Sequence, residues 1–315
     1  MNELVSVIIP AYNHQDFIEE AILSVYNQTY EFIELILIDD KSEDKTYEKA
    51  LRIINKKEFK KRFYKVIFLQ NENNEGAHNT INKGIALSSG KFISILNSDD
   101  FYDSYRIEKL LSSWKGDRYF FAFSNYLFVD EDSTPILFHP LFIKLQLSIK
   151  EAFEDFLVPW FMFLQKNIAL STGNFFFSKE LYNKIGGFAD LSYCHDLHFI
   201  LHALRYTNPC FVDEPLYYYR IHRGNTFREV SHLSIVEAEI VLSEFFFATE
   251  YLELVNPECP CRINFPVYFE NFLKKFNLEV YFTRSVTGYM PVHRVIEKQL
   301  FEHYNFLKRK INHES

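Results

Sequence analysis

Short apolar runs alternate with segments of helical spacing over the first hundred residues. The run at residues 5–10 is rich in Val and Ile and ends at a proline, as a buried strand does. Further strands are expected at residues 35–38, 65–69 and 91–96, and helices at 17–26, 46–54 and 79–87. Strands that alternate with helices over short connections form βαβ units. The pattern therefore predicts a Rossmann-like α/β fold, a mostly parallel sheet flanked by helices.

The rest of the chain divides into a mixed region and a helical one. We expect strands at residues 119–129, 172–177 and 215–221, and helices at 179–185 and 196–206. From about Arg228, strand signals become rare and long stretches with apolar periodicity follow. Residues 291–311 place most of their apolar side chains near one helical face. We therefore predict an α/β domain over residues 1–228 and a helical C-terminal extension over residues 229–315.

Composition limits the partners and the compartment. The chain has 34 basic and 42 acidic residues, and its net charge of −8 argues against nucleic acid as a partner. The sequence shows no basic leader and no apolar stretch long enough to span a bilayer, so we expect a cytoplasmic protein. Four cysteines are too few to staple a chain of 315 residues. The 34 Phe and 20 Tyr residues leave open whether the rings form core, a binding groove or a partner-facing surface.

Two of the expected strands end in a pair of aspartates. Asp39 and Asp40 follow the run LILI, and Asp99 and Asp100 follow FISILNS. Ligands bind at the carboxyl ends of strands in open α/β sheets, and carboxylates there accept hydrogen bonds from a nucleoside or bind Mg²⁺ or Mn²⁺. The alternative is that these aspartates only cap the next helix or turn. Two such pairs at the same edge of one sheet argue against this alternative. Glycine-rich phosphate motifs, a Gly-x-Ser-x-Gly elbow and a His-Glu-x-x-His motif are absent.

Seven segments of the chain, in this order, resemble the family 2 glycosyltransferases of the GT-A fold. They are VSVIIPAYN (5–13), AILSVYNQTY (21–30), ELILIDDKSEDKT (34–46), NEGAHNTINKGIALSSGKFISILNSDD (74–100), GNFFFSKELYNKIGGF (173–188), HD (195–196) and YYYRIHRGN (217–225). The resemblance covers residues 5 to about 226. It implies a GT-A fold and an inverting, metal-dependent enzyme that moves a single sugar from a nucleoside-diphosphate sugar, UDP-linked, to an acceptor hydroxyl.

The resemblance also implies how the donor is bound. Pro10 and Tyr12 line the nucleotide pocket, and Asp40 accepts a hydrogen bond from the base. In the counterpart of the family's DxD motif, Asp99 faces the ribose and Asp100 binds Mn²⁺ or Mg²⁺. Such an ion takes up the charge that develops on a diphosphate leaving group.

The catalytic base and a loop over the diphosphate are implied in the same way. Asp196 corresponds to the base, since a carboxylate near the acceptor hydroxyl is needed to take its proton. The family usually has an acidic residue before the base, and this chain has His195, which repels Asp196 less. His222 lies where the family folds a loop over the diphosphate, and Arg220 and Arg223 beside it complement phosphate charge or belong to a solvated loop.

We therefore expect a non-processive glycosyltransferase that builds surface polysaccharide or glycolipid, with a glycan or a lipid-linked saccharide as acceptor. A catalytically silent nucleotide- or glycan-binding module and a sugar nucleotidyltransferase are the alternatives. The first would not need an intact set of aspartates, and the second would need a basic, glycine-rich signature near residue 10. The C-terminal helices could pack on the domain, join a homodimer, or bind the inner face of a membrane.

Overall fold

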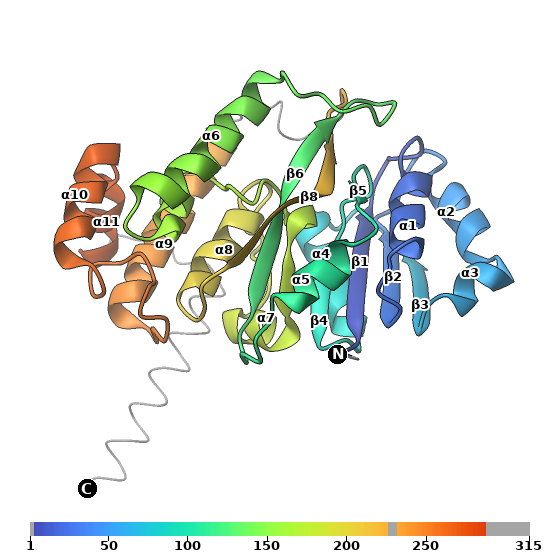
Figure 1. The fold of residues 1–315 in the computed structure, drawn as a ribbon, viewed down its shortest axis with the longest axis horizontal. Helices are drawn as coiled ribbons and strands as arrows, with labels where there is room; N and C mark the ends of the chain where they lie inside the picture. Colours follow the sequence, from blue (N-terminus) through green and yellow to red (C-terminus); the bar gives the residue numbers. More distant parts are fainter. Residues whose placement is uncertain (1–2, 226–231, 288–315) are drawn as a thin grey trace, which may run out of the picture.

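The computed structural model describes residues 3–225 and 232–287. Its centre is an eight-stranded sheet in the order β3-β2-β1-β4-β7-β6-β8-β5 (Figure 1). The strands are β1 (Val5–Ala11), β2 (Ile33–Asp39), β3 (Lys65–Gln70), β4 (Phe92–Ile95), β5 (Phe101–Tyr102), β6 (Phe121–Val129), β7 (Phe176–Ser178) and β8 (Cys210–Arg220). Strands β1 to β4 pair in parallel, as do β6 and β8, whereas β7 runs antiparallel to both β4 and β6, and β5 runs antiparallel to β8.

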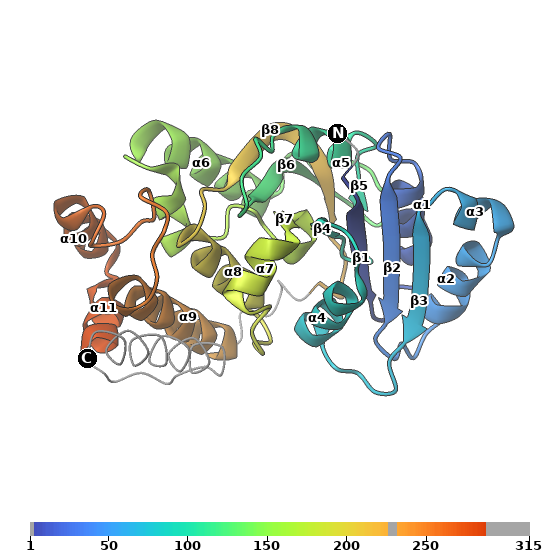
Figure 2. The same cartoon turned by 90° about the horizontal axis from the view of Figure 1, so that it is seen from below.

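Helices surround this sheet and extend it at one end. They are α1 (Ile18–Tyr26), α2 (Thr46–Ile54), α3 (Lys57–Lys61), α4 (Ala77–Leu87), α5 (Arg106–Ser112), α6 (Pro140–Asp155), α7 (Lys179–Ile185), α8 (His195–Leu204), α9 (His232–Tyr251), α10 (Pro266–Phe276) and α11 (Glu279–Val286). Two short 3₁₀ helices are η1 (Pro159–Leu164) and η2 (Thr172–Asn174). Helices α1 to α3 lie near the β3 edge, and α9 to α11 gather beyond the opposite part of the sheet (Figures 1 and 2).

The order of the strands creates a crevice at the ends of β1 and β4. The chain passes from β1 to β2 and β3 on one side, and β4 then pairs with the other side of β1. Both β1 and β2 are buried almost throughout, which explains their mostly apolar sequences, and their buried Ser6 and Glu34 side chains are hydrogen-bonded to each other. A ligand site is expected at such a reversal of strand order, outside the carboxyl ends of the strands.

The predicted α/β architecture is confirmed, with differences in the middle of the chain. The expected strand at residues 172–177 begins as the 3₁₀ helix η2, and only Phe176–Ser178 forms a strand. A Cβ at Gly173 would lie 2.2 Å from the Tyr217 hydroxyl, so η2 depends on a close approach that only glycine allows. Residues 136–171, for which the sequence pattern predicts no helix or strand, contain α6 and η1.

The expected helical C-terminal region is present and packs on the α/β domain. Phe161 of η1 lies 5.6 Å from Phe265 and 5.0 Å from Phe272, measured between ring centroids. The boundary at residue 228 and the expected helix at 291–311 lie outside the described residues. In the part that the structure describes, no helix is both long and apolar enough to span a membrane.

Most of the aromatic excess belongs to the core. The largest fully buried side chains include Phe92, Phe121, Phe123, Phe128, Phe161, Phe163 and Phe175. Trp160 is also buried and packs against Phe153 and Phe163 rather than lining the cavity described below.

Candidate active site

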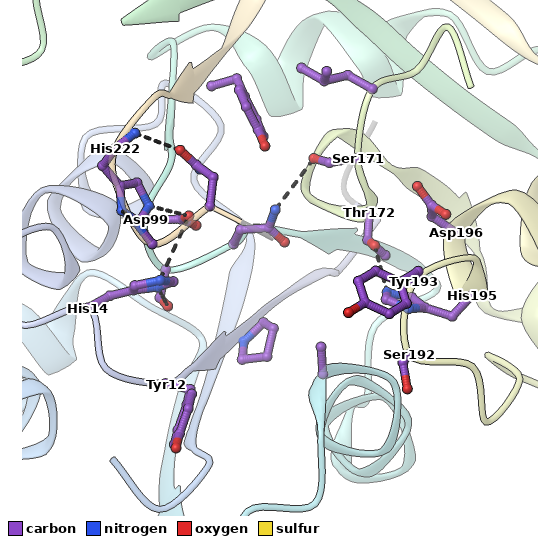
Figure 3. A pocket seen from close by; sticks show the side chains of 18 of the residues that line it. Tyr12, His14, Asp99, Ser171, Thr172, Ser192, Tyr193, His195, Asp196 and His222 are labelled. Carbon is purple, nitrogen blue, oxygen red and sulfur yellow. Dashed lines mark hydrogen bonds and ion pairs between the residues drawn. The ribbon is translucent and has the colours of Figure 1, made fainter. Parts of the chain in front are cut away.

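A cavity of about 1160 Å³ opens at the carboxyl edge of the sheet. Six of the seven predicted site residues line it: Pro10, Tyr12, Asp40, Asp99, Asp196 and His222. Its volume exceeds the usual 300–1,000 Å³ of a small-ligand site, so it has room for two reactants. Figure 3 shows Asp99 and His222 at one end of the cavity and Asp196 at the other.

Asp99 lies between two histidines from distant parts of the chain. Its Oδ2 atom is 3.1 Å from His222 Nε2 and 3.8 Å from His14 Nε2 (Figure 3). The His14 ring is fixed from its other side, since Nδ1 lies 2.7 Å from the Ser98 hydroxyl. Burial acts to raise the pKa of Asp99, but His14 and His222 outweigh it and hold this pKa below its usual value. One carboxylate oxygen and two ring nitrogens thus converge as possible ligands for a metal ion.

Asp100, the predicted metal ligand, points away from the cavity. Its carboxylate accepts hydrogen bonds from the Arg220 backbone amide at 2.8 Å, from Asn97 Nδ2 at 3.1 Å and from the Tyr217 hydroxyl. Burial and the neighbouring Asp99 raise the pKa of Asp100 well above its usual value. Because three protein donors hold the Asp100 carboxylate outside the cavity lining and Asp99 lines the cavity, the geometry favours Asp99 over Asp100 as a metal ligand.

Asp40 holds the loop that follows β3. Its Oδ1 accepts hydrogen bonds from Asn71 Nδ2 at 2.7 Å and from the Glu75 amide at 2.8 Å, and its Oδ2 accepts one from the Gly76 amide at 2.9 Å. Asp40 also lines the cavity, and a carboxylate oxygen has two lone pairs. Oδ2 therefore keeps capacity for one further donor, as the predicted contact with a nucleotide base requires.

Asp196 lies in the first turn of α8 and is held by a single side chain from the η1–η2 loop. Asn167 Nδ2 donates a hydrogen bond to Asp196 Oδ2 at 2.6 Å, and the amide of Leu197 contacts Oδ1 at 2.6 Å. Burial raises the pKa of Asp196, and the neighbouring His195 together with these two donors moderates the rise. A carboxylate with a raised pKa that opens onto a cavity is suited to accept a proton.

His195 next to the base is held in a neutral form. Its Nδ1 lies 3.2 Å from the carbonyl oxygen of Leu191, which can only accept a hydrogen bond, so Nδ1 carries the proton. Its Nε2 is then free to accept from the Thr172 hydroxyl at 3.1 Å. Burial lowers the pKa of His195 and favours the same uncharged state. The base therefore has a neutral neighbour in place of a carboxylate.

A match to a family model identifies the family of this chain. The family model described as "Glycosyl transferase family 2" matches residues 6–186, more than half of the chain. The chain belongs to glycosyl transferase family 2. This match confirms the predicted family and the expected enzyme class, a glycosyltransferase. The metal and donor roles predicted for individual residues stay predictions.

Named relatives support the same family. The Escherichia coli protein WfaP, a UDP-Glc:alpha-D-GlcNAc-diphosphoundecaprenol beta-1,3-glucosyltransferase, is 35% identical over 130 residues, which are 41% of this chain and 48% of the relative. The chain spans about half the length of this relative, and 51% and 50% of the length of two other curated relatives that are 36% and 34% identical.

Solved structures confirm the GT-A fold. Residues 1–349 of TarS from S. aureus, in complex with UDP-GlcNAc, align with a TM-score of 0.63 and 18% identity, over 87% of this chain and 73% of that fragment. The mannosyltransferase PcManGT from Pyrobaculum calidifontis, in complex with GDP-Man and Mn²⁺, aligns with a TM-score of 0.57 and 14% identity, over 91% of this chain and 74% of that one.

Sequence reasoning missed two residues that shape this family 2 site. The sequence predicts no role for His14, although a histidine just after a first strand is a candidate ligand. Asn167 lies in a stretch without a recognisable motif. Of the two arginines near His222, Arg223 lines the cavity, whereas Arg220 is buried and pairs with Glu20.

Proposed function

We propose that this chain transfers one sugar, with inversion, from a UDP-linked nucleoside-diphosphate sugar to an acceptor hydroxyl. One observation carries the proposal: Asp196 and the group formed by His14, Asp99 and His222 line one cavity from opposite ends (Figure 3). A single displacement needs a base on one side of the anomeric carbon and stabilisation of the leaving group on the other. Inversion follows from that arrangement.

At the leaving-group end, Asp99, His222 and His14 would hold a divalent cation. The donor set fits a first-row transition ion such as Mn²⁺, because the carboxylate suits Mn²⁺ and imidazole nitrogens bind ions of this series. When bound, Mn²⁺ or Mg²⁺ supplies positive charge against the diphosphate leaving group. Pro10, Tyr12 and Asp40 line the stretch of cavity that receives the nucleoside.

At the acceptor end, Asp196 takes the proton of the attacking hydroxyl. The hydroxyl oxygen forms a bond to the anomeric carbon while the bond from that carbon to the diphosphate oxygen breaks. Its electron pair leaves with the nucleoside diphosphate, and the proton goes to a carboxylate oxygen of Asp196. Asn167 orients this carboxylate, and the neutral His195 adds no negative charge beside it.

The acceptor class follows from the relatives by analogy. WfaP acts, by its name, on a saccharide joined through a diphosphate to undecaprenol. For this chain we propose an acceptor hydroxyl in a glycan or a lipid-linked saccharide, used in surface polysaccharide or glycolipid synthesis. The analogy predicts work at the cytoplasmic face of a membrane.

Nucleotide binding tests the donor half of the proposal. A panel of nucleotide sugars is titrated against the purified chain with and without Mn²⁺ or Mg²⁺, in the natural sequence and in Asp99→Asn. We expect one UDP-sugar to bind with metal-dependent affinity, and the variant to lose the metal effect. If every nucleotide fails to bind, or if Asp99→Asn binds equally well in the same metal-dependent way, the proposal is wrong.

Donor hydrolysis tests whether the site is catalytic. We expect the bound sugar nucleotide to be hydrolysed slowly in the absence of acceptor, and this reaction to drop in Asp196→Asn while nucleotide affinity is kept. A silent binding module would bind the nucleotide and hydrolyse none of it in either protein.

A further inference from the structure

Helix α6 forms the wall of the cavity beside the catalytic base. Leu141, Lys144 and Leu145 of this helix line the cavity, as do Lys166 and Asn167 of the following loop. Asn167 binds the Asp196 carboxylate, so Lys166 lies directly beside the residue that positions the base. This part of the cavity is therefore on the acceptor side of the site.

Two lysines of this wall, Lys144 and Lys166, lie close to the same turn of α6. Lys166 Nζ donates a hydrogen bond to the Ser148 hydroxyl at 2.9 Å, and Ser148 lies one helical turn after Lys144. Among the described residues, neither lysine forms an ion pair with a carboxylate, whereas Lys150 on the same helix pairs with Glu154 at 3.7 Å. Two positive charges without an acidic partner, in a chain of net charge −8, form a local site for an anion.

An apolar stripe runs along α6 next to these lysines. Ile143 and Leu147, one turn apart, expose 42% and 60% of their surface, and Phe138 just before the helix exposes 88%. Because Lys144 and Leu147 are three residues apart on the helix, their side chains are neighbours on its surface, and the apolar row lies beside Lys144. A ligand that covers the lysines and the apolar row would carry a negative group next to a hydrocarbon chain.

We propose that Lys144 and Lys166 bind the phosphate group of a lipid-linked acceptor, and that Phe138, Ile143 and Leu147 contact its hydrocarbon chain. The inference rests on the proposed function, and it names the acceptor as a saccharide phosphate or diphosphate of a long-chain alcohol. Charge complementarity selects this occupant over an uncharged glycan, which would gain nothing from two ammonium groups. The lipid then lies along α6 and holds the sugar hydroxyl toward Asp196.

Vesicle flotation tests this surface directly. The purified chain is mixed with phosphatidylcholine vesicles that contain a polyprenyl diphosphate, and with matched vesicles that contain the corresponding polyprenol. We expect the diphosphate vesicles to bind at least about tenfold more protein. We expect the double variant Lys144→Gln/Lys166→Gln to lose that preference, and the double variant Lys144→Arg/Lys166→Arg to keep it. Lys150→Gln, which removes the same charge from the same helix, serves as the control.

The apolar half has its own matched pair of variants. Ile143→Ser/Leu147→Ser should weaken binding to the diphosphate vesicles severalfold, whereas Val267→Ser, which changes a residue of α10 that is 72% exposed, should not. Equal binding to both kinds of vesicle, or an equal loss in Lys150→Gln, overturns the inference. So does an equal loss of nucleotide affinity in the Lys→Gln double variant, because the lysines would then serve the donor. Failure of the proposed function has a different signature: no nucleotide binds to the unmodified chain.

Discussion

The carboxylate of Asp100 accepts a hydrogen bond from the backbone amide of Arg220, 2.8 Å away, and this bond ties the chain after β4 to the end of β8. His222 follows two residues later, and its ring meets Asp99. Tyr217, also on β8, donates a further hydrogen bond to Asp100. Asp100 therefore acts as a positioning residue that brings His222 to Asp99, and it is Asp99 that faces the cavity.

The two adjacent aspartates should respond differently to the same substitution. Asp99→Asn removes a carboxylate that faces the cavity, so we expect metal-dependent nucleotide affinity to fall at least about tenfold. Asp100→Asn replaces one carboxylate oxygen with an NH2 group that faces one or two of the three protein donors in a buried site, so we expect the free energy of unfolding to fall by about 1–3 kcal/mol. Isothermal titration with Mn²⁺ and denaturant unfolding measure the two effects. The assignment fails if Asp100→Asn removes the metal effect while Asp99→Asn keeps it.

The pH dependence of transfer should report the ionisation of Asp196. Burial raises the pKa of this carboxyl, and only its ionised form accepts a proton, so the rate should fall as pH is lowered through the raised pKa. Asn167→Ala removes a hydrogen bond to the charged form, and the acidic limb of kcat/KM should move to higher pH. Asn74→Ala is the control, because Asn74 lines the same cavity but bonds to Gly76. An acidic limb that stays in place in Asn167→Ala would exclude Asp196 as the titrating base.

The first half of the sheet could be predicted from the sequence because its strands carry their own signal. The central strands β1 and β2 are buried on both faces, which demands a mostly apolar run in place of the alternation of a strand with one exposed face. The aspartates after β2 and β4 were found for the same reason: they end such runs. The position of Asp196 came from a family motif instead.

The roles of neighbouring residues in turns could not be predicted. Asp99 and Asp100 lie in a turn closed by the Asp100 amide and the Asn97 carbonyl, where side-chain direction follows no period. Which of them faces the cavity depends on Arg220, more than a hundred residues away. The positions of Lys144 and Lys166 in the cavity likewise depend on where α6 packs on the domain. The sequence of one helix does not predict that packing.

The packing of the C-terminal helical region on the α/β domain should depend on the buried ring of Phe161. Phe161 is fully buried and packs against Phe265 and Phe272 of the C-terminal region. Phe161→Ala should lower the free energy of unfolding by about 3–5 kcal/mol, since a large cavity replaces the ring. Phe138→Ala, the same change at a side chain that is 88% exposed, should lower it by less than about 0.5 kcal/mol. Equal effects in chemical denaturation would mean that η1 does not join the two parts.

The neutral His195 beside Asp196 should influence the pH range in which the enzyme is active. His195 holds Thr172 and the Leu191 carbonyl without carrying charge, whereas the family usually has a carboxylate at this position. His195→Asp adds a negative charge beside Asp196, which makes ionisation of the base harder, so the acidic limb of kcat/KM should move to higher pH. His195→Gln keeps the position neutral and should leave the limb near that of the natural enzyme, although lost contacts can lower kcat. A larger displacement in His195→Gln than in His195→Asp would show that the histidine acts through its own charge, contrary to the burial that lowers its pKa.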